Sequence, residues 1–212
     1  MRFLIPIRTP RWIARLYSSY LWGVPNSKAI YLTFDDGPTP EATLEILALL
    51  ETYNAKATFF CVGNNVEKYP ELFKKIAIHG HSWSNHTYYH NDIRKSTPKE
   101  YRESVEKCSA IMEEHAKQKS ILFRPPQGRI RHNFKRILGP GYTMVFWSLL
   151  SMDHLSNATI ANCTRNLLRA KPGDIIVLHD NARTKGVTLN SLEAFLKWAT
   201  RNEIDLLGLP ME

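Results

Sequence analysis

The chain has 212 residues, of which 43% are hydrophobic, so it can bury a core and is most simply one globular domain. Its 28 Lys and Arg residues exceed its 20 Asp and Glu residues, which gives a net charge of +8, but the basic residues are scattered rather than arranged in stripes. We therefore expect a charge that serves solubility and no nucleic-acid binding. No stretch approaches the roughly 20 apolar residues of a transmembrane helix.

The three cysteines, Cys61, Cys108 and Cys163, have no paired or CxxC spacing, so the sequence predicts neither a disulfide framework nor a thiolate metal site. Cys61 lies in an apolar run, and we expect it in the core. Residues 1–8 are interrupted by Pro and Arg too early to form the apolar core of a signal peptide.

Residues 1–28 are rich in basic and aromatic side chains. Two interpretations are open, an arm laid on the rest of the chain or a helix lying on a membrane surface. We favour the arm because Pro10 and Pro25 leave little room for a long amphipathic helix. We accordingly divide the chain into an N-terminal arm, residues 1–28, and a domain formed by residues 29–212.

After the arm, apolar runs typical of buried strands alternate with apolar residues at helical spacing. Strands are expected at 29–34, 57–62, 81–86, 121–124, 142–147, 174–178 and near 204, with a turn directly after the second strand at Gly63 and Asn64. Helices are expected at 41–53, 70–78, 99–117, 133–138, 158–169 and 189–200. This alternation predicts an α/β fold whose parallel sheet is covered by helices, either a barrel or a doubly wound sheet.

Polar residues follow many of these strands directly, and they are Asp35 and Asp36, His86, Arg124, Asp153 and His179. A site built from the carboxyl ends of many strands is typical of a (β/α) barrel. We therefore prefer the barrel to the doubly wound sheet.

The first strand ends in Asp35 and Asp36, followed by a Gly-Pro turn. Adjacent side chains on an extended backbone point to opposite sides, so we expect the two carboxylates to have different roles, one as a metal ligand and one as a base. A plain surface turn is the alternative for this tetrapeptide.

His86 and His90 lie four residues apart, a spacing that lets two imidazoles converge on one ion. Together with one carboxylate they form a recognised ligand set for zinc or a related first-row metal. Two exposed histidines without a metal are the alternative. For Arg124 the alternative is a surface arginine before a turn, and for His179 a hydrogen-bonded core histidine, unless a charged partner such as Asp153 lies beside it.

Five segments occur in the order and approximate spacing of the five motifs of the polysaccharide deacetylase family (carbohydrate esterase family 4), and they are Thr33–Pro38, His86–His90, Arg124–Pro126, Trp147–His154 and Leu178–His179. The sequence resembles this family from about Ile30 to Leu206. The resemblance implies a distorted (β/α) barrel of a single domain and metal-dependent hydrolysis of an N- or O-acetyl group on a glycan.

By the same resemblance, Asp36, His86 and His90 are the metal ligands, and the ion is Zn²⁺, Co²⁺ or another divalent first-row metal. Asp35 is the general base, positioned by Arg124, whose charge favours the ionised carboxylate.

The resemblance also makes His179 the general acid, oriented by Asp153. Leu178 would line the pocket for the acetyl methyl group, and the backbone N–H of Gln127 would donate to the oxyanion. Tyr88, with Tyr89 and Trp83, is expected to stack on sugar rings, although core packing explains Trp83 equally well.

Three positions depart from the family's pattern. Gln127 stands where an aromatic residue is usual, Leu150 replaces the first acid of the fourth motif, and His154 replaces its Trp. The second acid, Asp153, remains. The chemistry is therefore expected to be intact while the substrate groove is altered.

We expect a deacetylase acting on an N-acetylglucosamine-containing polymer, of the chitin or peptidoglycan type ahead of acetylated xylan. Hydrolysis of a small-molecule amide or imide on the same scaffold is one alternative, and a poorly active glycan-binding relative is another. We further expect a monomer with an acetylated glycan as its partner. Such a substrate implies an extracellular or cell-wall location, although no ordinary signal peptide is visible.

Overall fold

The computed structural model describes residues 6–130 and 134–211. Its strands are β1 (Ile30–Asp35), β2 (Thr58–Cys61), β3 (Ser82–Asn85), β4 (Leu122–Phe123), β5 (Thr143–Met144), β6 (Leu149–Leu150), β7 (Ile175–His179) and β8 (Leu206–Leu207). Its α-helices are α1 (Arg11–Leu16), α2 (Thr43–Thr52), α3 (Gly63–Lys68), α4 (Pro70–Ile78), α5 (Pro98–Ala116), α6 (Phe134–Leu138), α7 (Ile160–Leu167) and α8 (Lys185–Arg201), and a 3₁₀ turn, η1, spans Pro126–Gly128. Two predictions fall partly outside the described residues, the helix start at Asn133 and the interrupted segment 1–8, of which residues 1–5 are not described.

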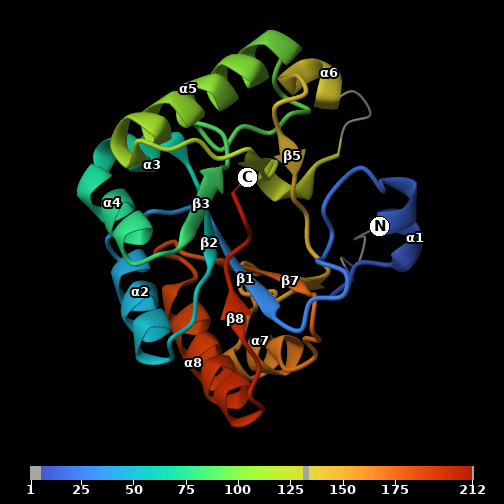
Figure 1. Cartoon of the computed structure of the whole chain (residues 1–212), viewed down its shortest axis with the longest axis vertical. Coiled ribbons are helices and arrows are strands. Elements are labelled where there is room, and N and C mark those ends of the chain that lie inside the picture. The colour runs from blue at the N-terminus through green and yellow to red at the C-terminus, as the bar shows by residue number, and fades with distance from the viewer. Residues whose placement is uncertain (1–5, 131–133, 212) are drawn as a thin grey trace.

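The strands form one parallel sheet in the order β5-β4-β3-β2-β1-β7-β6, with β8 paired to the first half of β1. Figure 1 shows the strands at the centre of the molecule and the helices α2 to α5, α7 and α8 around them. The predicted α/β fold, a distorted barrel with parallel strands, is confirmed.

The two edges of the sheet are connected by one short segment, residues 143–150. Its first part, β5, pairs with β4, and its last part, β6, pairs with β7 at the other edge of the sheet. The N-terminal arm lies along this segment, because Leu21 N–H donates to Met144 O and Leu150 N–H donates to Ile7 O, both at 2.8 Å. The arm is therefore hydrogen-bonded to both edge strands of the sheet. Figure 1 shows its helix α1 beside the sheet.

Strand β1 is buried along its whole length, as expected for a parallel strand covered on both faces. Leu32 and Phe34 belong to the cluster beneath the helices, where the Phe34 ring stacks on Phe59 at 5.1 Å. Because side chains alternate along a strand, Thr33 and Asp35 point the other way, into the barrel. This alternation delivers a carboxylate to the barrel interior.

The turn predicted at Gly63 and Asn64 is wrong, since helix α3 begins there. The first N–H groups of this helix donate to the carbonyls of Thr87 and Tyr88, at 3.0 and 2.9 Å. These bonds satisfy donors that a helix start leaves open, and no capping side chain is needed. Tertiary contacts, rather than local sequence, therefore start α3 and hold the loop that carries His86 and His90.

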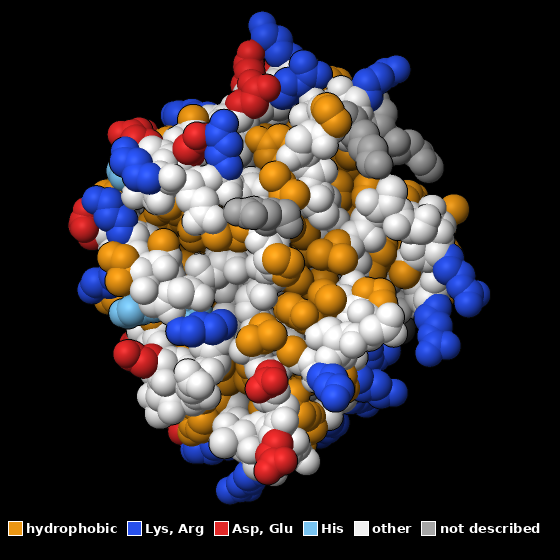
Figure 2. Space-filling view, in the orientation of Figure 1, with side chains coloured by type: hydrophobic (Ala, Val, Ile, Leu, Met, Phe, Trp, Pro, Cys, Tyr) orange, Lys and Arg blue, Asp and Glu red, His pale blue; other side chains and the backbone are white. Residues whose placement is uncertain are grey.

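The surface agrees with a dispersed charge. In Figure 2 the Lys and Arg side chains are spread around the outline of the face shown, and hydrophobic side chains are visible near its centre, between β5 and β7. None of the helices in the described ranges has the length and apolar character needed to cross a bilayer. Cys61 is buried as predicted, and all three cysteines are free.

Candidate active site

A pocket of about 450 Å³ opens at the carboxyl ends of the strands. It is lined by six of the predicted metal, catalytic and substrate-binding residues, Asp35, Asp36, His86, His90, Gln127 and His179, and by Leu150 and His154, which depart from the family's pattern. They come from β1, from the loops after β3 and β4, and from β7. The prediction that strand ends distant in sequence meet at one site is confirmed.

Three of these side chains form a cluster that could hold a cation. Asp36 Oδ1 lies 3.2 Å from His90 Nε2 and 3.8 Å from His86 Nε2, and one ligand atom from each residue lies within 4.8 Å of the others. Neither histidine is simply exposed, since His86 is buried and His90 is half-buried. An Asp–His–His set with open positions suits zinc and related divalent metals.

The cluster depends on a turn in the backbone at Asp36. Asp36 has φ of +85°, so the strand geometry ends at Asp35 and the chain turns back. The expectation that the two carboxylates point to opposite sides is therefore wrong, because both lie within 4.0 Å of His86 Nε2. They remain chemically distinct, since only Asp35 is paired with an arginine.

Contacts with groups outside the cluster orient His86, and burial and charge set the protonation states of His86 and Asp36. His86 Nδ1 is hydrogen-bonded to Arg124 O at 2.8 Å, which leaves Nε2 facing Asp36. Burial lowers the pKa of His86 to about 4, so at neutral pH this imidazole is uncharged, the form that binds a metal. Burial alone would raise the pKa of Asp36, but a hydrogen bond from His90 and neighbouring imidazole charges outweigh it and hold that pKa well below its ordinary value.

Arg124 is wholly buried, which excludes the alternative of a surface arginine. Its Nη1 donates to Asp35 Oδ1 at 2.7 Å and to Thr33 Oγ1 at 2.6 Å, and its Nη2 donates to Phe146 O at 3.1 Å. The guanidinium also lies 4.0 Å from the centre of the Phe60 ring. A buried charge is stable only when it is paired, so the Arg124 guanidinium and the Asp35 carboxylate stabilise each other.

His179 has the charged partner that the sequence suggests. Its Nδ1 is 2.7 Å from Asp153 Oδ1, and Asp153 Oδ2 accepts from the His179 N–H and from Thr188 Oγ1, each at 2.8 Å. Burial alone would lower the pKa of His179, but the charge and hydrogen bond of Asp153 outweigh it and raise this pKa to about 9. The imidazole is therefore protonated at neutral pH and can donate a proton.

The turn after β1 and the turn after β7 are joined by Asp180. Its Oδ1 accepts from Gly37 N–H at 2.8 Å, its Oδ2 accepts from Thr43 Oγ1 at 2.7 Å, and its own N–H donates to Asp35 O at 3.1 Å. Burial raises the pKa of Asp180 to about 8, so the carboxyl is largely neutral at pH 7. A Cβ at Gly37 would collide with this carboxyl, so only glycine allows the approach.

Residues 23–145 match the sequence profile of a family described as polysaccharide deacetylase. The chain belongs to this family. Two peptidoglycan-N-acetylglucosamine deacetylases of Bacillus cereus are 37% and 35% identical to it over 171 and 179 residues. These alignments cover 79% and 82% of this chain, and 61% and 84% of the two relatives.

Solved structures of other polysaccharide deacetylases share the fold. A peptidoglycan N-acetylglucosamine deacetylase crystallised with a naphthalenyl N-oxidanyl-benzamide superposes with a TM-score of 0.86, at 32% identity and 95% coverage of both chains. The peptidoglycan deacetylase PdaC of Bacillus subtilis superposes with a TM-score of 0.79, at 28% identity, covering 87% of this chain and 89% of its own.

Not every predicted site residue of this family member reaches the pocket. Leu178 points to the opposite side of β7, into the cluster beneath the helices, and its neighbours Val177 and His179 line the pocket instead. Val177, Leu150 and Trp147 form the apolar part of the wall. The expectation that Leu178 lines an acetyl pocket is wrong, because strand alternation turns it away.

The three aromatic residues expected to stack on sugars also lie elsewhere. Tyr88 is 2% exposed, its hydroxyl donates to Glu67, and it is absent from the pocket wall. Trp83 is equally buried and meets Phe73 edge-on in the core. Tyr89 is exposed but does not line the pocket. The structure does not bring Tyr88 or Trp83 to a surface where a glycan could stack.

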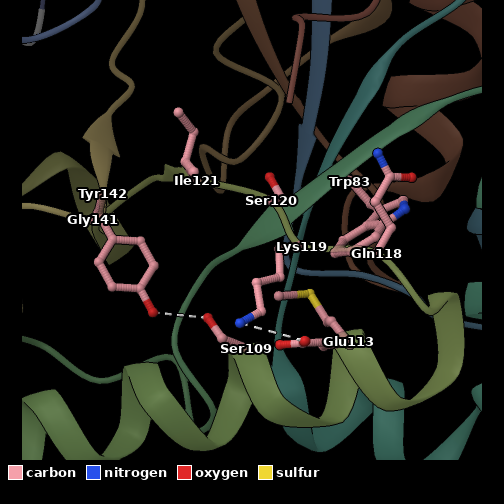
Figure 3. Close-up of a pocket in the computed structure, with 10 residues that line it drawn as sticks. Trp83, Ser109, Glu113, Gln118, Lys119, Ser120, Ile121, Gly141 and Tyr142 are labelled. Carbon is pink, nitrogen blue, oxygen red and sulfur yellow. Dashed lines mark hydrogen bonds and ion pairs between the residues drawn. The ribbon is translucent and has the colours of Figure 1, made fainter. Parts of the chain in front are cut away.

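A second cavity, of about 260 Å³, lies between α5, the residues that precede β4 and Tyr142 (Figure 3). Two polar contacts are visible there, Ser109 Oγ with Tyr142 Oη at 2.9 Å and Lys119 Nζ with Glu113 Oε1 at 3.5 Å. None of the candidate metal, base or acid residues lines it, so the chemistry belongs to the larger pocket.

Sequence reasoning missed two residues that hold the site. Asn181 Nδ2 donates to Asp36 Oδ2 at 2.8 Å, which leaves Asp36 Oδ1 facing the histidines. Asp180 joins the two turns, as described above. Both directly follow His179, and proximity to that residue was the only available signal.

Proposed function

We propose that this chain is a metal-dependent hydrolase that removes N-acetyl groups from an N-acetylglucosamine-containing polysaccharide of the peptidoglycan or chitin type. The proposal is carried by one observation, the meeting of an Asp–His–His cluster, an Arg-paired aspartate and an Asp-paired histidine in a single pocket. The relatives support the substrate class, since they include peptidoglycan-N-acetylglucosamine deacetylases and a Bradyrhizobium chitooligosaccharide deacetylase, which is 31% identical over 200 residues.

We propose Asp36, His86 and His90 as the metal ligands, with Zn²⁺ or Co²⁺ as the resident ion. The donor set fits such an ion because His86 is neutral and the Asn181 contact leaves one Asp36 oxygen available. Burial lowers and Asp36 raises the pKa of His90, with a net increase, so a cation would displace the proton that the two residues share. When bound, the cation polarises the acetamide carbonyl and makes a water molecule acidic.

Each proton transfer is assigned to one side chain beside this cluster. Asp35 accepts the proton of the attacking water, with its carboxylate held in place by Arg124. The backbone N–H of Gln127, in a residue with φ of +60° at the pocket wall, donates to the oxygen on which negative charge develops. His179, protonated and held by Asp153, gives its proton to the departing amine.

The requirement for opposed protonation states supports this assignment. The acid has a carboxylate beside it, which favours the protonated imidazole, and the base has a guanidinium beside it, which holds it in place. The amine leaves only if it is protonated, because an amide anion is a very poor leaving group. A pocket lined by both groups and by the cluster meets both needs.

Acetate release tests the proposal. Chelator-treated chain would be loaded with one equivalent of Zn²⁺ and incubated with N-acetylated chitooligosaccharides, peptidoglycan, acetylated xylan and a small cyclic imide. We expect acetate from the first two substrates, abolished by the chelator and restored by metal. Imide hydrolysis without acetate release would instead indicate a small-molecule hydrolase, and glycan binding without release would indicate a binding protein.

A further inference from the structure

A second group of potential metal ligands lies in the same pocket, on the side of the general acid. Asp153 Oδ1 is 2.7 Å from His179 Nδ1 and 3.9 Å from His154 Nδ1. One ligand atom from each of the three residues lies within 4.8 Å of the others. Like the first cluster, this one has one carboxylate and two imidazoles.

The two clusters match closely in geometry. The rings of His86 and His90 have centres 5.1 Å apart and planes inclined at 56°, and those of His154 and His179 are 5.0 Å apart and inclined at 54°. The carboxylate-to-imidazole distances are 3.2 and 3.8 Å in the first cluster and 2.7 and 3.9 Å in the second. An arrangement that suits a divalent cation in one cluster suits it in the other.

His154 supplies an independent sign that a ligand is missing. Its Nδ1 is buried and has no hydrogen-bond partner within the described ranges. Its distance of 3.9 Å from Asp153 Oδ1 is too long for a hydrogen bond but leaves room for an ion that both atoms could contact. A buried ring nitrogen that lacks a hydrogen-bond partner and lies beside a carboxylate is placed to act as a metal ligand.

Two hydrogen bonds would hold the Asp153 carboxylate in position to bind an ion. Ser151 Oγ donates to Oδ1 at 2.9 Å, and Thr188 Oγ1 donates to Oδ2 at 2.8 Å. These bonds play the part that the Asn181 contact plays for Asp36 in the first cluster. These hydroxyl groups therefore hold the Asp153 carboxylate whether a proton or a cation lies between it and the imidazoles.

We propose that Asp153, His154 and His179 form a second divalent-cation site, which binds Zn²⁺ or Co²⁺ and inhibits the enzyme when occupied. It arises in this chain because a histidine stands at position 154, where the family usually has Trp. A cation bound to His179 Nδ1 takes the place of the proton shared with Asp153, and one proton is released to solvent for each ion bound. The Nε2–H that remains on the metal-bound ring is a weaker acid than the imidazolium. The inhibition therefore rests on the proposed function, in which His179 is the acid, whereas the binding does not.

Metal stoichiometry tests the binding without reference to activity. The full chain would be stripped with chelator and titrated with Zn²⁺ by calorimetry and with Co²⁺ by visible absorption. We expect two ions per chain in the unaltered protein and one in each of His154→Phe and His90→Gln. His79→Phe, which changes an exposed histidine outside the pocket, should still bind two.

Activity then tests the consequence. Acetate release by the unaltered chain should rise with the first equivalent of Zn²⁺ and fall as free Zn²⁺ increases further. In His154→Phe, normalised to its own maximum, the inhibitory phase should move to at least about tenfold higher free Zn²⁺, because loss of a ligand weakens a site at least as much as loss of a supporting residue. His154→Trp, which restores the family's usual residue, provides a second variant should Phe impair folding.

The outcomes are decisive. One ion per chain in the unaltered protein, two ions in folded His154→Phe, or loss of the second ion in His79→Phe would overturn the second site. A chain that binds two ions as predicted but releases no acetate from any glycan would refute the proposed function while leaving the second site intact.

Discussion

Replacing Asp153 with Asn tests how His179, the proposed general acid, is kept protonated. The pKa of His179 is raised from 6.5 to about 9, which corresponds to about 3 kcal/mol of net interaction with the protonated imidazole. The side chain of Asn is nearly isosteric with that of Asp but carries no charge. Burial, which lowers the pKa of His179, is then opposed only by Asp36 and Asp35, whose charges are shared with the bound cation and with Arg124. With a pKa of 6.5 or below, at most about one tenth of His179 would be protonated at pH 7.5.

Two measurements follow from this value, both on chain loaded with a single equivalent of metal. In the unaltered protein, kcat/KM should decline on the alkaline side with an apparent pKa near 9, the value raised by Asp153. In Asp153→Asn this decline should move to below about pH 7, and kcat/KM at pH 7.5 should fall at least about tenfold.

Stability has its own pH dependence with a definite sign. Because the folded-state pKa of His179 exceeds the unfolded value of 6.5, its contribution is complete below pH 6.5 and is lost as the pH rises through about 9. The free energy of unfolding should therefore decrease across this range by up to about 3 kcal/mol in the unaltered chain, and not in Asp153→Asn. An alkaline limb that stays near pH 9 in the variant, or activity at pH 7.5 within twofold of the unaltered chain, would refute this account.

Three further predictions concern the base, the buried arginine and the wall. Asp35→Asn should lower kcat by at least about 100-fold while the metal content by mass spectrometry is unchanged, and unchanged turnover would remove Asp35 from the mechanism. Arg124→Met should lower the free energy of unfolding in urea by about 3–5 kcal/mol because it leaves a buried carboxylate unpaired, whereas Arg183→Met at the exposed rim should change it by less than about 0.5 kcal/mol. Leu178→Ala should cost about 2–5 kcal/mol of stability with KM unchanged, and a raised KM without loss of stability would return Leu178 to the pocket wall in place of Val177.

The broad architecture and the meeting of the site residues could be predicted because they depend on strong signals. Alternating strand and helix patterns predict a parallel sheet, and the carboxyl ends of parallel strands lie at one edge. Asp35, His86 and His179 were therefore expected together although they are far apart in sequence, and they line one pocket.

The direction of individual side chains could not be predicted equally well. Strand β7 is apolar from Ile175 to Leu178 because it is buried on both faces, so only His179 at its end marks the inner side. Alternation back from His179 favours Val177 over Leu178 in the pocket wall, against the role that the family resemblance gives Leu178. At Asp36 the strand ends in a positive φ, and an argument from extended geometry does not apply there.

Long-range contacts account for the other differences. Helix α3 begins at Gly63 because its open N–H groups meet the carbonyls of a loop more than 20 residues later in the chain. Tyr88, in that loop, packs in the core cluster, where Lys107 covers its ring with Nζ 3.6 Å from the ring centre and its hydroxyl donates to Glu67. The local sequence contains no pattern that predicts such contacts.

The bridge formed by Asp180 limits how this scaffold can diversify. Because Asp180, directly after the proposed acid, binds Asp35 through its N–H and the turn after the proposed base through its neutral carboxyl, a lengthened loop at either turn would displace both groups at once. Gln127, Arg129 and Arg183 line the outer wall and take no part in that fastening. New substrate preferences can therefore be introduced at these three positions while the spacing between proton acceptor and proton donor is inherited unchanged.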